Sequence, residues 1–142
     1  MTIRKARQTD LDDILSLLGM VDLPGEGVSE NLENFFVCMH DRTIIGCIGL
    51  RIRGKSGLMR SLAVSPEHRG KGIGNALIRK IFSYAKDNKI SDLYLLTTTA
   101  EEYYARYGFA RIQRDAVDPH MLDAPEFKSV CAQAAVCMKK GL

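Results

Sequence analysis

Residues 62–74 constrain the fold of this chain more than any other stretch. An apolar run ending at Val64 is followed by a basic turn with glycine at positions 70, 72 and 74, and then by a helical apolar pattern. Glycine lacks a Cβ, so consecutive backbone N–H groups can converge on one anion. The start of a helix adds unpaired N–H donors and a positive dipole end. With the charges of Arg69 and Lys71, the sequence predicts a phosphate or pyrophosphate site between a strand and a helix.

Two common phosphate-binding motifs do not fit this turn. A Walker A loop requires Gly-x-x-x-x-Gly-Lys followed by Ser or Thr, and no glycine-lysine pair here has that context. The dinucleotide fingerprint lies near the first strand of its unit and needs an acidic residue after the next strand. Here the glycines lie in mid-chain and the next strand ends in Thr97, Thr98 and Thr99. A glycine-rich turn can also simply close a tight connection, but the flanking basic residues favour binding.

Length and composition indicate a single domain over residues 1–142. A chain of this size buries roughly two thirds of its unfolded surface without disulfides or metal, and 46% hydrophobic with 26% charged residues is ordinary for a globular protein. The net charge of +3 is too small to predict nucleic-acid binding. No apolar run is long enough for a membrane span, and the N-terminus lacks the apolar core of a secretion signal. We therefore expect a cytoplasmic protein with no nucleic-acid or membrane partner.

The four cysteines do not have the spacing of a metal or redox site. Cys38, Cys47, Cys131 and Cys137 are too far apart for a zinc ribbon or a CxxC motif. Cys38 and Cys47 lie in apolar runs and are interpreted as small buried hydrophobic residues. Cys131 and Cys137 are more ambiguous, with inert thiols the leading interpretation, and we expect no metal.

The remaining pattern predicts a mixed α/β chain. A helix over 11–19 is expected to begin at a capping box formed by Thr9 and Asp12, and a weak helix is expected over 29–34. Apolar positions from Ile73 to Ala85 predict an amphipathic helix, and a short helix over 100–107 ends at Gly108. Predicted strands cover 2–7, 35–40, 43–51, 58–64, 92–97, 109–113 and 134–139.

The order and spacing of these elements resemble the GNAT superfamily of acetyl-CoA-dependent N-acetyltransferases. The family signature, Arg or Gln, two residues, Gly, one residue, then Gly or Ala, matches Arg69, Gly72 and Gly74. A later Tyr-x-x-x-Gly-Phe element matches Tyr104, Gly108 and Phe109. The resemblance spans nearly the whole chain. It implies an α/β (α+β) GNAT fold, in which about four helices flank a mixed sheet of six to seven strands. The N-terminal strands are antiparallel, and a parallel pair follows residues 69–74, which we call the glycine loop.

The resemblance also implies how acetyl-CoA is held. The backbone of the strand would pair with the pantetheine arm, and the amides of the glycine loop would hold the pyrophosphate. The predicted acetyl-CoA residues are Leu62, Ala63, Val64, Arg69, Gly70, Lys71, Gly72, Ile73, Gly74 and Asn75.

The family reaction is direct attack of an amine on the thioester. It needs a neutral amine, donors for the developing oxyanion and an acid for the departing thiolate. A backbone N–H of the strand ending at Val64 is a candidate oxyanion donor, and Tyr104 occupies the family's general-acid position. The alternative for Tyr104 is a packing role. The base is unassigned: Glu26, Glu30 and Glu33 border the acceptor site in the family, although each taken singly is more typical of a solvated surface charge. His40, His68 and His120 show no partnering pattern.

Arg60 is the main indicator of the acceptor. It interrupts an apolar strand, so it needs an anionic partner, either a substrate carboxylate or a structural aspartate. Glu26, Thr97 and Thr98 complete the predicted substrate residues, although threonines at a strand end are commonly helix caps.

Subfamily resemblance is weaker and points in two directions. Residues 95–99 and 114–119 resemble the amino-acid acetyltransferase branch that includes N-acetylglutamate synthases. The segment after Glu126 resembles acetyltransferases of arsenic-resistance clusters, which implies an amino acid or an arsinyl or phosphinyl analogue as the amine substrate. The remaining alternative is a sensor that binds acetyl-CoA without turnover. The family resemblance is compatible with a homodimer.

Overall fold

The structure is a computed structural model that describes residues 1–129 and 133–142. Within it the chain forms two compact units. The first unit comprises Met1–Arg51 and Met59–Tyr84, and the second comprises Ile52–Leu58 and Ala85–Leu142. In the described part of the chain no helix has the length and apolar character that a membrane span requires.

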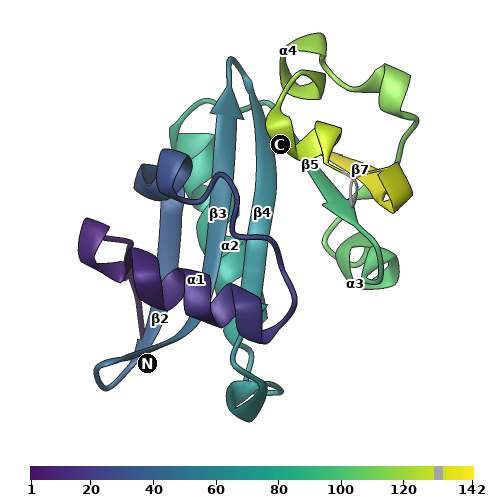
Figure 1. Cartoon of the computed structure of the whole chain (residues 1–142). Coiled ribbons are helices and arrows are strands. Elements are labelled where there is room, and N and C mark those ends of the chain that lie inside the picture. Colours follow the sequence, from purple (N-terminus) through teal and green to yellow (C-terminus); the bar gives the residue numbers. More distant parts are fainter. Residues whose placement is uncertain (130–132) are drawn as a thin grey trace. The chain divides into compact units, whose positions relative to one another are not determined.

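Strands of the first unit follow the order β1-β2-β3-β4 (Figure 1). The strands are β1 (Thr2–Lys5), β2 (Phe35–His40), β3 (Thr43–Arg53) and β4 (Ser56–Val64). β1 pairs antiparallel with β2, and β2 pairs antiparallel with β3. The hairpin between β2 and β3 turns at Asp41, whose φ of 55° is the left-handed conformation that Asp tolerates. The antiparallel N-terminal sheet is therefore confirmed.

Helix α1 (Leu11–Met20) covers one face of these strands. Its buried residues Ile14, Leu17 and Leu18 form one core cluster with strand residues that include Val37 and Cys47. The predicted capping box at Thr9 and Asp12 is wrong. The carboxylate of Asp10 instead accepts the Arg7 N–H at 2.7 Å and pairs with Arg4 at 2.7 Å, because one carboxylate satisfies both groups.

Helix α2 (Ile73–Asp87) covers the opposite face. The Tyr84 ring packs edge-on against Phe36 with centroids 5.2 Å apart. A Cβ built on Gly46 would lie 3.1 Å from both Ile73 and Leu77, so the helix approaches the backbone of β3 closely. The helix matches the predicted amphipathic pattern, in which the apolar members Leu77, Ile81 and Ala85 are fully buried.

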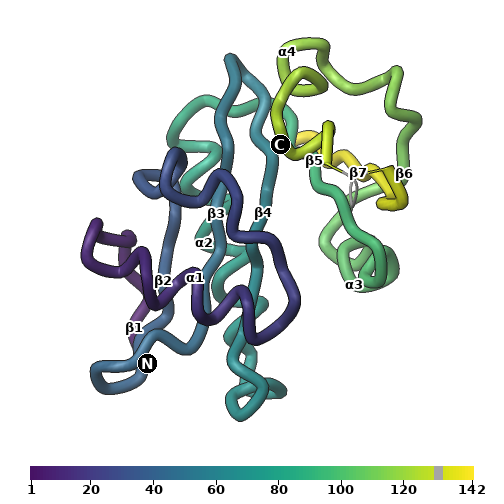
Figure 2. The backbone as a smooth tube through the Cα atoms, viewed as in Figure 1, coloured from purple at the N-terminus to yellow at the C-terminus, as the bar shows by residue number. Residues whose placement is uncertain are grey.

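Strands of the second unit follow the order β4-β5-β7-β6, with the first residues of β4 at one end (Figure 2). Ser56–Leu58 of β4 pairs in parallel with β5 (Asp92–Thr97), which confirms the predicted parallel pair. β5 pairs antiparallel with β7 (Val136–Gly141), which pairs antiparallel with β6 (Ala110–Arg111). Helices α3 (Glu101–Ala105) and α4 (Pro119–Leu122) complete the unit. Its core gathers Leu58, Tyr94, Val117, Met121, Ala124, Phe127 and Cys137.

Several predicted bounds were wrong in the second unit. The strand expected from position 134 begins at Val136, since Gln133 and Ala134 are helical. The strand expected over 109–113 is reduced to Ala110–Arg111. The helix expected over 100–107 ends at Ala105. In the first unit, the weak helix expected over 29–34 has these bounds and is a 3-10 helix, Ser29–Asn34. Cys38, Cys47 and Cys137 are buried as predicted for Cys38 and Cys47. The interpretation of Cys131 lies outside the described residues.

Candidate active site

The first part of the candidate site is a distorted segment of β4. Ser61 has a φ of +60°, which is unusual for an L-residue inside a strand. Its carbonyl accepts a hydrogen bond from the Cys47 thiol of β3 at 3.2 Å. The predicted pantetheine-binding residues Leu62, Ala63 and Val64 follow directly after it. The strand thus departs from regular geometry at the point where it reaches these residues.

The glycine loop follows β4 and a short 3-10 helix, Pro66–His68. Gly70 and Gly72 have φ values of +79° and +80°, so both need the conformational freedom of glycine. A Cβ built at either position meets no atom within 4 Å, so the space beside the loop is open. The loop leads into the first turn of the 15-residue helix α2, whose N–H groups favour an anion.

The loop's polar side chains lie on its surface. Arg69, Lys71 and Asn75 are exposed, whereas Ile73 is buried and anchors the start of α2 to the core. The Arg69 side chain also approaches the Val64 carbonyl, at 3.4 Å. Open space, two left-handed glycines, two cations and a helix start together fit a pyrophosphate group.

A second group, which we call the arginine cluster, consists of Arg51, Arg60 and the backbone of Glu26 and Gly27. A Cβ built on Gly27 would lie 2.6 Å from Arg60 Nη1 and 3.1 Å from Arg51 Nη2, so both guanidinium groups reach one point beside the loop. Arg60 donates to the Glu26 carbonyl through Nη2 and to the Ser61 hydroxyl through Nε. Gly27, at φ +82°, therefore leaves the space that the two guanidinium groups use.

Arg51 is a member of this cluster that sequence reasoning missed. Its side chain is buried in β3, with only 8% of the residue exposed. Its Nη2 lies 3.8 Å from Glu30 Oε2, which is an ion-pair distance but too long for a hydrogen bond. A charged residue between apolar neighbours was the signal used for Arg60, and Arg51 carries the same signal between Leu50 and Ile52.

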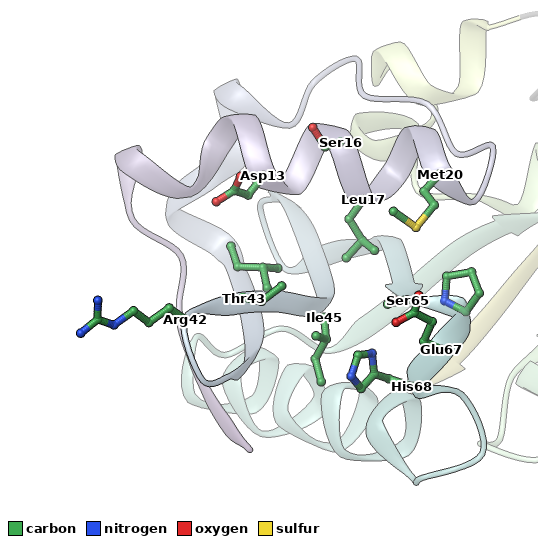
Figure 3. A pocket seen from close by; sticks show the side chains of 12 residues that line it. Asp13, Ser16, Leu17, Met20, Arg42, Thr43, Ile45, Ser65, Glu67 and His68 are labelled. Atoms are coloured by element: carbon green, nitrogen blue, oxygen red, sulfur yellow. The ribbon is translucent and has the colours of Figure 1, made fainter.

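A pocket of about 520 Å³ lies on the α1 face of the first unit (Figure 3). Its lining comes from α1, from the start of β3 and from residues 65–68. The side chains of Asp13 and Ser16 lie on α1, opposite Ile45 of β3. Glu67 and His68 lie near Ile45. None of the residues predicted from the sequence as site residues lines this pocket.

Tyr104 and the threonines belong to the second unit. Tyr104 lies in α3 and packs edge-on against Phe109 with ring centroids 6.2 Å apart. Burial, with a smaller contribution from Tyr107, raises the pKa of Tyr104 to about 12. The phenol therefore stays protonated throughout the neutral range and is available as a hydrogen-bond donor.

Thr97 and Thr98 lie at the end of β5. The Thr97 hydroxyl accepts a hydrogen bond from the Ala100 backbone N–H at 3.0 Å, the capping role that threonine commonly has at a strand end. The Thr98 side chain is exposed. Within the first unit, by contrast, the structure brings two predicted residues together, since the Arg60 guanidinium donates to the main-chain carbonyl of Glu26.

Comparison with protein families matches residues 31–111 to a model described as an acetyltransferase (GNAT) domain. An amino-acid acetyltransferase of Mycobacterium tuberculosis is 29% identical over 131 residues, which cover 85% of this chain and 75% of that protein. An Escherichia coli K12 protein of the same name is 29% identical over 122 residues. That match covers 80% of this chain but only 28% of the relative.

Solved structures share the fold at lower identity. N-acetylglutamate synthase from Neisseria gonorrhoeae, in complex with coenzyme A and N-acetyl-glutamate, has a TM-score of 0.87 and 24% identity. The alignment covers 99% of this chain and 35% of that one. A Mycobacterium tuberculosis protein solved in complex with CoA has a TM-score of 0.79 and 23% identity, with 100% and 99% of the two chains covered. At these identities the likeness shows the fold.

Proposed function

Because this chain belongs to the GNAT acetyltransferase family, we propose that it acts as a single domain that transfers an acetyl group from acetyl-CoA to the amino group of a small amino acid. The observation that carries the proposal is the convergence of Arg51 and Arg60 on one point beside Gly27. Paired guanidinium groups match the geometry and charge of a carboxylate. An amino acid supplies that carboxylate together with the amine.

Acetyl-CoA is the proposed acetyl donor because the glycine loop fits its pyrophosphate. Gly70 and Gly72 leave open space at positive φ, and α2 presents its N-terminal donors next to them. Arg69 and Lys71 add positive charge at the surface. The irregular segment of β4 after Ser61 provides Leu62, Ala63 and Val64 as partners for the extended pantetheine arm, in the manner of an added strand.

The proposed reaction is direct transfer. The neutral amine nitrogen attacks the thioester carbon, the C–N bond forms and the C–S bond breaks. One proton leaves the nitrogen and one proton ends on the coenzyme A sulfur. A backbone N–H of β4 stabilises the negative charge that develops on the carbonyl oxygen. Glu26 and Glu30, on the loop beside the arginine cluster, are the proposed routes by which the amine loses its proton.

The pKa of Tyr104 refines its proposed role. A phenol with a pKa of about 12 is a weaker acid than the ordinary phenol, near 10, that the sequence suggested. Proton transfer from it to the departing thiolate is therefore less favourable than from an ordinary phenol. We therefore assign Tyr104 a hydrogen bond to the departing sulfur, while the proton comes ultimately from the attacking amine.

The acceptor class follows from charge. The relatives are named amino-acid acetyltransferases, and one structural neighbour was solved with N-acetyl-glutamate. Glutamate is therefore the first acceptor to test. Amino-acid analogues with an arsinyl or phosphinyl group also carry an anion and an amine on one skeleton, so the arginine cluster is compatible with them.

The test measures thiol release from acetyl-CoA with glutamate, other amino acids, arsinyl and phosphinyl analogues, and simple alkylamines. The proposal predicts turnover with at least one amino acid and little with alkylamines of the same length. Higher kcat/KM for an arsinyl or phosphinyl compound than for every amino acid would move the acceptor to that class. Tight acetyl-CoA binding without turnover on any amine would replace the enzyme by a sensor.

A further inference from the structure

The distortion of β4 at Ser61 requires something to hold it. An L-residue at φ +60° occupies a sparsely populated conformation, which persists only where neighbouring groups stabilise it. Ser61 is not at a turn: it is the sixth residue of a nine-residue strand. Its carbonyl and side chain are therefore the places to look for the stabilising contacts.

The Cys47 thiol makes the contact on the β3 side. Its Sγ lies 3.2 Å from the Ser61 carbonyl oxygen, and the residue is completely buried in the core beneath α1. A backbone hydrogen bond from Ala63 also reaches the sulfur, although burial dominates and raises the pKa of Cys47 to about 12. The thiol consequently keeps its proton and remains a donor. One side chain thus contacts the residues on both sides of Leu62.

These contacts determine the direction in which the backbone N–H of Leu62 points. Because the peptide bond between Ser61 and Leu62 is trans and planar, the Leu62 N–H points opposite to the Ser61 C=O. The Ser61 carbonyl faces the Cys47 thiol, so the peptide N–H of Leu62 points away from Cys47. The β4–β5 ladder ends at Leu58, four residues earlier, so the ladder does not use this N–H.

We propose that Cys47 is a positioning residue, which holds the distorted backbone at Ser61 and thereby aims the Leu62 N–H at the carbonyl oxygen of the thioester. The inference rests on the proposed acetyl transfer and deepens it. It assigns to a cysteine, interpreted from sequence as a small buried hydrophobic residue, an effect on the transition state. A purely packing role for Cys47 predicts an effect on stability alone.

Cys38 provides the matched control. It is also a buried cysteine in a central strand, but it lies in β2, one strand farther from β4. Its neighbour Val37 belongs to the same core cluster as Cys47, so strand alternation directs Cys38 to the opposite face. Cys38 lies at the register shift between β2 and β3, and among the described residues its thiol makes no hydrogen bond to Ser61. Cys38→Ala therefore removes a buried thiol from the same sheet without removing the contact to Ser61.

The first measurement is independent of activity. Amide hydrogen exchange is followed at Ala63, whose N–H contacts the Cys47 sulfur, in Cys47→Ala, Cys38→Ala and Cys47→Ser. We expect exchange in Cys47→Ala to be about tenfold faster than in Cys38→Ala, because the distorted segment opens locally rather than with the whole domain. Cys47→Ser retains a donor and is expected to fall between them. Equal exchange in the two alanine variants would overturn the proposal.

The second measurement separates kcat from KM. Loss of an aimed oxyanion donor acts only in the transition state, so kcat in Cys47→Ala is expected to fall about tenfold while the KM for acetyl-CoA stays within about twofold. The serine variant is expected to recover part of kcat. A kcat in Cys47→Ala equal to that in Cys38→Ala would overturn the positioning role. If the unmodified protein turns over no amine, the proposed function fails, and hydrogen exchange still decides what Cys47 does.

Discussion

The glycine loop and the arginine cluster both lie in the first unit, yet they are built in opposite ways. The loop is a run of consecutive residues whose properties are local: two glycines at positive φ, exposed cations and a helix start. The arginine cluster joins Arg51 of β3 and Arg60 of β4 to the loop at Gly27, which lies more than twenty residues earlier in the sequence. The proposed donor site is therefore encoded locally, whereas the proposed acceptor site depends on the tertiary fold.

Substitution of Arg51 is expected to have the largest effect and to distinguish the arginine cluster from the glycine loop. Arg51→Met is expected to raise the KM for the amino-acid acceptor about 100-fold, because a charge-assisted contact to a buried carboxylate is lost. The KM for acetyl-CoA is expected to stay within about twofold. Steady-state kinetics with each substrate varied in turn gives both values.

The control for Arg51 is Arg53→Met. Arg53 lies on the same strand, but it belongs to the second unit, where its guanidinium donates to the His120 carbonyl. An equal rise in acceptor KM in both variants would mean that Arg51 acts through charge at a distance rather than through the cluster.

A lower stability of the first unit should leave the KM values for both substrates unchanged. The variant Asp10→Asn tests this. Asp10→Asn is expected to lower the free energy of unfolding by about 2 kcal/mol at pH 7, because the Arg4 partner is left partly buried. The Arg4 hydrogen bond is the main reason why the pKa of Asp10 lies below its ordinary value.

The sign of this shift sets the pH dependence. A carboxyl with a lowered folded-state pKa stabilises the protein above its ordinary pKa, near 3.9, and loses that contribution as the pH falls further. Denaturation of both proteins between pH 7 and pH 2.5 is expected to show their stabilities converging below about pH 4. A difference in the free energy of unfolding that stays constant with pH would contradict the ion pair. A changed KM in Asp10→Asn at pH 7 would mean that stability alone alters KM, so that KM no longer distinguishes the two sites.

The glycine loop gives a smaller, complementary effect. Gly72→Ala is expected to raise the KM for acetyl-CoA about tenfold, since a Cβ enters the space proposed for the pyrophosphate and the positive φ is strained. The acceptor KM is expected to stay unchanged.

Gly54→Ala is the matched control, because Gly54 also has a positive φ, +60°, with no atom within 4 Å of a built Cβ. Both variants should lose about 1 kcal/mol of stability, measured by urea denaturation. Similar KM values for acetyl-CoA in the two variants would show that backbone strain, rather than the anion site, is being measured.

Tyr104→Phe is expected to have the smallest effect, a fall of about fivefold in kcat that is constant between pH 6 and pH 10, because the phenol stays protonated over that range. Tyr103→Phe, on the same helix, is the control and should leave kcat unchanged. A fall in wild-type kcat that is centred near pH 10 and absent from Tyr104→Phe would instead identify Tyr104 as an ordinary phenolic acid.

Sequence reasoning succeeded where the physics is local. The glycine spacing predicted a turn between a strand and a helix, the apolar periodicity predicted α2, and the continuous apolar run predicted the parallel strand β5. It failed where distant residues decide. The carboxylate of Asp10 took the capping role expected of Asp12, because Arg4 of β1 lies within reach. Cys47 was correctly predicted to be buried, but its contact with Ser61 depends on the pairing of two strands.

Binding of the acceptor carboxylate by the arginine cluster is tested most directly by comparing glutamate with the amine formed when its α-carboxylate is removed. Wild-type protein is predicted to prefer glutamate over its decarboxylated amine by about 100-fold in kcat/KM, and Arg60→Met is predicted to reduce that preference to less than about fivefold. The preference should fall because activity toward glutamate decreases while activity toward the amine is preserved. An unchanged preference in Arg60→Met would contradict the assignment of the acceptor carboxylate to the arginine cluster.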